Sequence, residues 1–271
     1  MKNNNKFRLD VWGAITLGTI ALYALFLLYP MAYLIRQSVL DPDTGSFTLA
    51  YFTKFFSKSY YFDTLINSFK VSITATVLSI AIGTPLAYLF TIFKIKGKSV
   101  LNILIVVASM SAPFIGAYSW ILLLGRSGII TTFFKNLGIA IPDIYGFGGI
   151  VLVMTLQLFP LVFLYAKGAL KNIDNSLIEA AENLGCSGIA CFFKVVVPLI
   201  MPTLLAAALL VFMRSFADFG TPMLIGEGYR TFPVVLYTEF INEVGGSDGF
   251  AAAIAVIAIV ITTLVLSLIH I

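Results

Sequence analysis

The feature that most limits what this chain can fold into is a series of long apolar runs. Hydrophobic residue types make up 59% of its 271 residues and charged types make up 11%, against about 25% charged residues in a typical soluble domain. A run of roughly 20 apolar residues can cross the hydrocarbon core of a bilayer as a helix, whereas a β-barrel would show short segments of alternating polarity. The sequence therefore predicts an all-α membrane protein embedded in membrane lipid.

Six of these runs are long enough to be transmembrane helices. The predicted spans are Val11–Ile35, Leu65–Phe93, Val100–Leu124, Gly149–Ala166, Leu199–Phe219 and Phe250–Ile271. The first run exceeds the apolar region of about 7–15 residues found in a cleaved signal peptide, so we expect it to remain as an anchor helix. Residues 1–64 are thus predicted to form an anchor helix with an outer loop, and residues 65–271 to form the transmembrane domain.

The basic residues predict which side of the membrane each loop occupies. Lysine and arginine are enriched in cytoplasmic loops, and an internal N-terminus makes segments 1–10, 94–99 and 167–198 cytoplasmic. These segments carry basic residues at a higher density than the outer segments, namely Lys2, Lys6, Arg8, Lys94, Lys96, Lys98, Lys167, Lys171 and Lys194. Topology therefore accounts for the placement of the basic residues, and the small net charge of +4 gives no indication of nucleic acid binding.

Prolines interrupt three of the predicted spans. Pro85, Pro113 and Pro160 each remove a backbone donor and are expected to bend their helices. Two interpretations remain open: ordinary kinked packing between neighbouring helices, or kinks that shape a central cavity.

The segment 171–198, between the fourth and fifth spans, is polar at its start and has a helical pattern. Ser176 precedes Glu179 by three residues, which predicts a capping box at the start of a short helix over Leu177–Leu184. Gly185 can end that helix in the left-handed conformation. A second short helix is expected over Ser187–Val197.

The same segment carries a longer motif. Glu179, Ala180 and Ala181 are followed by three residues, Gly185, nine residues, and then Val195-x-Val197-Pro198. This pattern resembles the signature loop of importer permeases of the ATP-binding-cassette superfamily, which reads Glu-Ala-Ala, three residues, Gly, nine residues, Ile-x-Leu-Pro. The spacing agrees throughout, and valine replaces isoleucine and leucine at two apolar positions. The resemblance extends from about Asn67 to the end of the sequence and includes Phe212–Pro222 in the fifth span.

The resemblance implies that this loop is a coupling helix, which docks in a groove of a separate cytoplasmic ATPase dimer. It implies further partners, a second permease copy or half and an extracytoplasmic solute-binding protein, and a multi-pass location in the bacterial cytoplasmic membrane. Carried over by position, Glu179 contacts a basic residue of the ATPase, Gly185 provides the bend, and Ala180 and Ala181 form a close-packed face. Glu179 could instead serve only as the helix cap. Because ATP would bind the separate ATPase, this chain is not expected to be an enzyme or to bind a cofactor.

The solute is less well indicated. The fifth span and the segment Gly226–Pro233 look most like the group of permeases for ferric iron, polyamines and phosphonates, and ferric iron is the first choice. The last run reaches the end of the sequence without a basic tail. We therefore expect either a truncated C-terminus or the first half of a permease whose two halves are fused.

Three polar residues of the spans are candidates for the solute pathway. Arg214 and Asp218 lie one helical turn apart and can pair, either as an interfacial ion pair at the helix end or as part of a pathway or gate. Gln157 lies one turn before Pro160 in the fourth span, where its amide needs a partner in hydrocarbon. A bond between helices or contact with solute would satisfy it.

Two other classes of function are alternatives for a chain with six apolar spans. An ion-coupled secondary transporter would be favoured by inverted repeats or paired broken helices, and no convincing internal repeat is seen. A membrane enzyme needs converging catalytic groups, whereas His270 is the only histidine, and Cys186 and Cys191 lack the spacing of a metal site. The sequence thus predicts neither catalytic nor metal-ligating residues.

Overall fold

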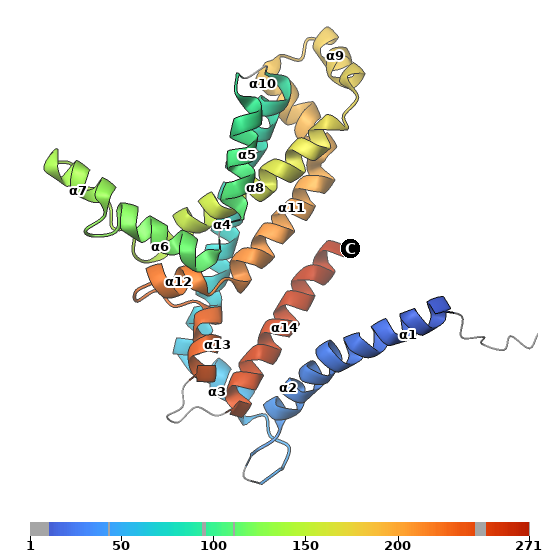
Figure 1. Ribbon diagram of the computed structural model, residues 1–271, viewed down its shortest axis with the longest axis vertical. Helices are drawn as coiled ribbons and strands as arrows, with labels where there is room; N and C mark the ends of the chain where they lie inside the picture. Colours follow the sequence, from blue (N-terminus) through green and yellow to red (C-terminus); the bar gives the residue numbers. More distant parts are fainter. Residues whose placement is uncertain (1–10, 43, 94–95, 111, 242–247, 271) are drawn as a thin grey trace, which may run out of the picture. The chain divides into compact units, whose positions relative to one another are not determined.

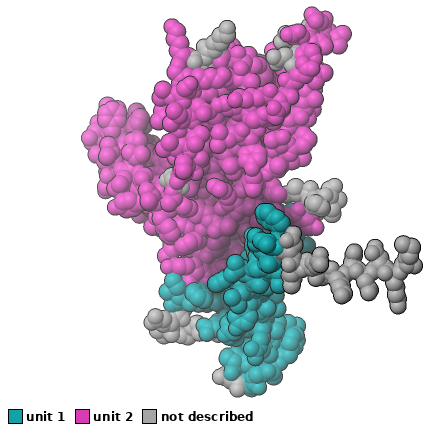
Figure 2. Space-filling model, turned by 45° about the vertical axis from the view of Figure 1, so that its right-hand side comes forward, with its two compact units in different colours: residues 1–58, 238–265 teal, residues 59–237, 266–271 magenta. Residues whose placement is uncertain are grey.

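The computed structural model describes residues 11–42, 44–93, 96–110, 112–241 and 248–270. These residues fold as two compact units, shown in different colours in Figure 2. Unit 1 comprises residues 1–58 and 238–265, and unit 2 comprises residues 59–237 and 266–271. Among the basic residues used to predict topology, Lys2, Lys6, Arg8 and Lys94 lie outside the described residues.

Unit 1 begins with a continuous apolar helix, Val11–Val39, in place of the predicted Val11–Ile35. It consists of α1 (Val11–Tyr23), the π-helical turn η1 (Ala24–Leu28) and α2 (Tyr29–Val39). α3 (Ala50–Ser57) then contacts the start of α14 (Asp248–His270). There the ammonium of Lys54 lies 4.0 Å from the ring centroid of Phe250.

Unit 2 contains the remaining helices, which Figure 1 labels in chain order. They are α4 (Ser59–Ile92), α5 (Lys98–Ser109), α6 (Pro113–Leu124), α7 (Ile129–Asn136), α8 (Phe147–Lys171), α9 (Asn175–Asn183), α10 (Gly188–Cys191), the π-helical turn η2 (Phe192–Val196), α11 (Val197–Ala217), α12 (Gly220–Ile225) and α13 (Phe232–Ile241). α13 and α14 each cross the boundary between the two units.

The core of unit 2 is the close packing of α4 against α8. With 34 residues, α4 is about 50 Å long at a rise of about 1.5 Å per residue. Gly83 allows the close approach, because a Cβ atom there would lie 2.8 Å from Cβ of Val162 and 2.9 Å from the carbonyl oxygen of Phe159. Small residues at such crossings let helix backbones pack tightly in membranes. Further along, the rings of Phe90 and Phe163 meet edge to face, with centroids 5.1 Å apart.

The prediction of six membrane spans is confirmed. The six helical segments of spanning length and apolarity in the described part of the chain are Val11–Val39, Ser59–Ile92, Pro113–Asn136, Phe147–Lys171, Gly188–Ala217 and Asp248–Ser267. The fold is therefore that of an all-α membrane protein, as its composition indicated.

The third span differs from the prediction of a single helix over Val100–Leu124. α5 ends at Ser109 and α6 begins at Pro113, and Ala112 between them is extended with φ −67° and ψ 142°. The ring of a proline disfavours the helical conformation for the residue before it, while proline fits the first turn of a helix. Pro113 therefore starts a helix, whereas Pro85 and Pro160 lie inside α4 and α8 as predicted.

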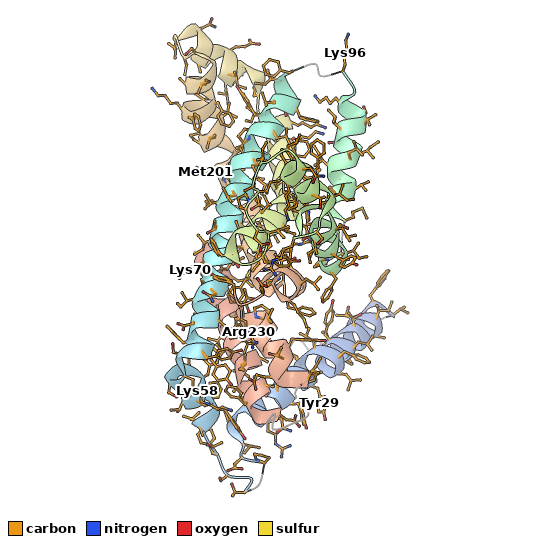
Figure 3. The ribbon with its side chains drawn as sticks, turned by 90° about the vertical axis from the view of Figure 1, so that its left-hand side faces the viewer. Tyr29, Lys58, Lys70, Lys96, Met201 and Arg230 are labelled. Atoms are coloured by element: carbon orange, nitrogen blue, oxygen red, sulfur yellow. The ribbon has the colours of Figure 1, made fainter. Side chains whose placement is uncertain are left out.

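The elements of unit 2 divide between two ends. α9 and α10 lie at one end, beside the end of α8 and the start of α5, and α12 lies toward the other (Figure 1). Lys96, in the turn between α4 and α5, marks the α9 end in Figure 3, and Arg230 lies toward the opposite end. The two candidate sites found by sequence analysis therefore occupy different parts of unit 2.

Candidate functional site

The loop over residues 171–198 joins α8 to α11 through two turns. α8 ends at Lys171, and Ile173 and Ile178 pack against the apolar core of unit 2. This contact anchors the first part of the loop to the ends of the membrane helices. The loop is thus a fixed projection of unit 2 and carries α9 at its tip.

α9 is capped by a different residue from the one predicted. The helix begins at Asn175, and Oδ1 of Asp174 accepts a hydrogen bond from the backbone amide of Ser176 at 3.0 Å. The backbone and hydroxyl donors of Ser176 hold the pKa of Asp174 below its ordinary value. The predicted capping box of Ser176 and Glu179 is wrong, because Ser176 lies in the first turn and Asp174 occupies the capping position.

Gly185 ends α9 as predicted. Its φ is +86°, in the left-handed region, and the amide of Cys186 donates to the carbonyl of Ala181 at 3.0 Å. That bond is characteristic of a Schellman motif, in which a glycine reverses the chain after the last helical turn. A Cβ atom at Gly185 would meet nothing within 4 Å, so glycine is needed for its backbone conformation alone.

The predicted second short helix, Ser187–Val197, is not separate from the fifth span. α10, η2 and α11 run as one helix from Gly188 to Ala217, longer than the predicted Leu199–Phe219. Pro198 lies in the first turn of α11, directly after η2. Proline cannot donate to the carbonyl four residues earlier, and a π-helical turn is a common way for a helix to absorb such a defect. The chain therefore enters the span without a break.

The loop exposes four large apolar side chains: Leu177, Leu184, Ile189 and Phe193. Leu184 is 89% exposed and Ile189 is 79% exposed. Of the small residues in the motif, Ala180 is exposed and Ala181 is half-buried. At the end of the motif, Val195 and Val197 are half-buried and Pro198 is exposed. We refer to Leu177, Leu184, Ile189 and Phe193 as the exposed loop side chains.

Glu179 lies where α9 meets the membrane helices. It lines a cavity of about 350 Å³ together with Tyr88, Thr91, Ile92, Leu170, Ile173 and Ile178. The carboxylate is therefore next to the ends of α4 and α8, while its side chain remains exposed. A contact of Glu179 with another protein stays a prediction.

The three candidate pathway residues come together in a second cavity. Gln157, Arg214 and Asp218 line a cavity of about 460 Å³, which we call the Arg214 cavity. Its other lining residues are Ser109, Pro113, Phe114, Leu158, Ala217, Phe219 and Gly220. Five helices of unit 2 or their ends contribute to it, so it lies where the break between α5 and α6 faces the end of α11.

The predicted pairing of Arg214 with Asp218 does not form. α11 ends at Ala217, and Asp218 is extended with φ −74° and ψ 120°, so the two side chains are no longer on one helical turn. The carboxylate instead accepts hydrogen bonds from the amide of Gly220 at 2.9 Å and from the amide and hydroxyl of Thr221 at 3.4 and 2.7 Å. Within the described part of the chain, no salt bridge or hydrogen bond reaches the exposed Arg214 guanidinium.

A third polar cluster was not found by sequence analysis. Nε of Arg126 lies 3.0 Å from Asp143, Nη2 lies 3.0 Å from Glu227, and the guanidinium lies 4.8 Å from the centroid of the Tyr145 ring. These residues connect three loops, all of which lie away from α9. Arg126 and Glu227 are 101 residues apart, so no local pattern in the sequence could have indicated their contact.

A metal centre is not indicated by the described side chains. Across the described ranges, no three His, Cys, Asp or Glu side chains gather closely enough to hold a metal ion. Cys186 and Cys191 form no disulfide within the described residues. The features that remain to be explained are the projecting loop and the Arg214 cavity.

Six apolar helices of spanning length, with a projecting loop and a cavity among the helices of unit 2, are the features of a multi-pass membrane protein. Residues 46–271 match the family described as "Binding-protein-dependent transport system inner membrane component", and the chain belongs to this family. The predicted family, fold class and multi-pass location in the bacterial inner membrane are thereby confirmed. The family is one of transport permeases and not of enzymes.

Two relatives illustrate the similarity. The chain is 28% identical over 240 residues to the ferric transport system permease protein FbpB of Actinobacillus pleuropneumoniae, covering 88% of this chain and 34% of that protein. It is 29% identical over 262 residues to the spermidine/putrescine transport system permease protein PotB of Haemophilus influenzae, covering 93% of this chain and 89% of that one. The chain thus spans about a third of the length of the ferric relative.

The fold is also found in solved structures. A chain of the bacterial alginate ABC transporter, crystallised in complex with a periplasmic protein bound to an alginate pentasaccharide, aligns with a TM-score of 0.80 and 15% sequence identity. The alignment covers 96% of this chain and 92% of that one. A second alginate importer structure aligns with a TM-score of 0.72 and 16% identity. The fold therefore matches that of ABC importer permeases.

Proposed function

We propose that this chain is the permease subunit of an ATP-driven importer, in which the loop over residues 171–198 docks on a separate ATPase. The single observation that carries the proposal is the form of that loop. α9 is shaped by its own caps, ends at Gly185 with φ +86°, and leaves Leu184 and Ile189 exposed. Large apolar side chains exposed around one loop favour a protein partner, and the Glu179–Pro198 motif indicates which kind.

The charges at the α9 end favour a cytoplasmic location for the loop. Lys96 and Lys98 lie in the turn before α5 and at its start, Lys171 ends α8, and Lys194 lies in η2. These elements share one end of unit 2 (Figure 1). Because short cytoplasmic loops carry an excess of lysine and arginine, this end would face the cytoplasm, where an ATPase can reach it.

The packing around α9 provides a route for force. Ile173 and Ile178 hold the first part of the loop against the core, and the rings of Tyr88 in α4 and Phe192 in η2 have centroids 4.6 Å apart. Closely packed interiors transmit displacement rather than absorb it. A movement of α9 driven by closure of the ATPase dimer would therefore shift α4, α8 and α11 together and change which side of the membrane the Arg214 cavity faces.

Membership of the family also supports proposals for the remaining partners and for the solute. A second permease copy or half would complete the path, and an extracytoplasmic binding protein would deliver the solute. ATP would bind the ATPase, and this chain would need no cofactor of its own. The ferric and polyamine relatives support ferric iron or a polyamine as solute, with ferric iron the first choice and a polyamine or a phosphonate the next.

The proposal is tested by isolating the permease in detergent with its ATPase co-expressed. Glu179→Arg reverses a charge on α9, the helix that carries Leu177 and directly precedes Leu184, two of the exposed loop side chains. Gly185→Pro is incompatible with a φ of +86°. We expect both variants to insert in the membrane and to lose the ATPase, while Gly188→Ala, in open space in the same loop, retains it. Normal ATPase association and normal uptake in both variants would refute the coupling role. Ion-driven uptake without any ATPase would favour a secondary transporter.

A further inference from the structure

We propose that the Arg214 cavity is a solute contact site that accepts an anionic oxygen group, either a carboxylate or a phosphate. The group could belong to a free anion or to the ligands that surround a metal ion. This inference deepens the proposed function and rests on it in one respect, because it takes the cavity to lie on the path of the solute. It concerns the class of solute and not the ATPase.

The hydrogen bonds in the cavity determine which charge is available there. Arg214 and Asp218 are the charged residues among those that line it. Both oxygens of Asp218 already accept hydrogen bonds from Gly220 and Thr221, the first residues of α12. The guanidinium of Arg214 has five donors and is exposed, with no partner among the described residues. An incoming group therefore meets an available cation and an engaged carboxylate.

The other walls of the cavity favour the same sign of charge. Pro113 and Phe114 begin α6, and Ala112 before them makes no side-chain cap. The start of a helix carries partial positive charge, which adds to that of Arg214. Gln157 contributes an amide, which can donate as well as accept. The rings of Phe114 and Phe219 pack edge to face, with centroids 5.1 Å apart, and form an apolar wall.

The ligand chemistry follows from this arrangement. A guanidinium binds carboxylate and phosphate through two parallel hydrogen bonds. A polyamine has ammonium donors and no acceptor, so it would be repelled by Arg214 and would gain little from a carboxylate that caps α12. A ferric ion coordinated by carboxylate or phosphate groups presents oxygens and fits. The cavity thus separates the two solute classes that the relatives transport.

The test is calorimetric titration of the purified full-length chain in lipid nanodiscs. The probes are inorganic phosphate, citrate, ferric citrate and spermidine. We expect the wild type to bind phosphate or a citrate species and not spermidine. Arg214→Gln should bind the anion at least about tenfold more weakly, because the charge-assisted hydrogen bonds of the guanidinium are lost. Lys70→Gln removes a positive charge from an exposed position of α4 outside the cavity and should leave binding unchanged (Figure 3).

The outcomes distinguish a free anion from a metal complex, and a further variant controls for misfolding. Citrate binding only with iron identifies a metal complex, whereas phosphate binding alone identifies a free anion, and either supports the inference. Arg214→Lys keeps the charge and should retain measurable anion binding, so a general folding defect would not be mistaken for loss of the site. Equal anion affinity in the wild type and Arg214→Gln, or spermidine binding by the wild type, would overturn it. ATPase association through α9 would be unaffected in either case, which leaves the proposed function standing.

Discussion

α8 and α9 are neighbours along the chain, separated only by Asn172, Ile173 and Asp174, yet they are held by different forces. α8 buries twelve of its residues, among them Val153, Met154 and Phe163. Among the described side chains of α9, none is buried. Helix α8 therefore owes its stability to packing within the chain, whereas α9 owes its shape to a cap and a glycine turn.

The largest expected effect tests the packed side of this comparison. Gly83→Ala places a Cβ atom 2.8 Å from Val162 and 2.9 Å from a backbone oxygen of α8, so α4 and α8 must separate. We expect the free energy of unfolding to fall by about 1–3 kcal/mol, although alanine favours helix by about 1 kcal/mol. Thermal unfolding in detergent measures it.

The matched control for this change is Gly168→Ala in α8. A Cβ atom at Gly168 would meet nothing within 4 Å, so the same substitution should leave stability unchanged or raise it by about 0.4–1 kcal/mol. An equal loss of stability in both variants would show that the α4–α8 contact is not the source of the stability of α8.

The next effect tests the turn that ends α9. Gly185→Ala puts a Cβ atom on a residue with φ +86°, at a conformational cost of about 1–2 kcal/mol. We expect faster amide hydrogen exchange over α9 and little change in the melting temperature of the helix bundle, because α9 adds no described buried side chain to it. Gly188→Ala, in open space, is the control. A fall in the melting temperature would show that α9 is part of the core.

A smaller effect should appear with pH at the other end of α9. The donors on Ser176 lower the pKa of Asp174 from its ordinary value of 3.8. A carboxylate with a lowered pKa in the folded state stabilises that state above its unfolded pKa, and the contribution is lost as the pH falls through the folded pKa. Protection of the Ser176 and Leu177 amides should therefore decline below about pH 4. Asp174→Asn, an uncharged cap, should abolish this dependence.

The smallest effect on stability is expected at the exposed loop side chains. Leu184 is 89% exposed, so Leu184→Gln should change the free energy of unfolding by no more than about 0.5 kcal/mol. The same variant should retain less ATPase during purification, because its apolar contact with the partner is lost. Unchanged ATPase retention with unchanged stability would remove Leu184 from the docking surface.

Features that depend on residues close together in the sequence could be predicted. The apolar runs predicted the six spans, and Gly185 was placed correctly as the left-handed end of a helix. The wrong predictions arose where one stretch of sequence was compatible with two local structures. Asp174 and Ser176 are both good caps, and the pattern could not decide between them. The sequence pattern predicts a kink at Pro113, although proline equally favours the first turn of a new helix.

Features assembled from distant segments were not predictable. Gln157 and Arg214 were identified singly as polar residues in apolar spans, but the cavity that joins them also requires the break before Pro113 and the end of α11 at Ala217. The same extended residue that ends α11, Asp218, prevented the predicted ion pair. The contact of Arg126 with Glu227 spans 101 residues and carries no local signal.

The most direct test of the central claim is thiol labelling of α9 from each side of the membrane. In a chain with Cys186 and Cys191 replaced by alanine, Leu184→Cys is treated with a membrane-impermeant maleimide in intact cells and in inside-out vesicles. We predict labelling only in inside-out vesicles, and protection when the ATPase is bound. Labelling in intact cells, or equal labelling with and without the ATPase, would contradict the account.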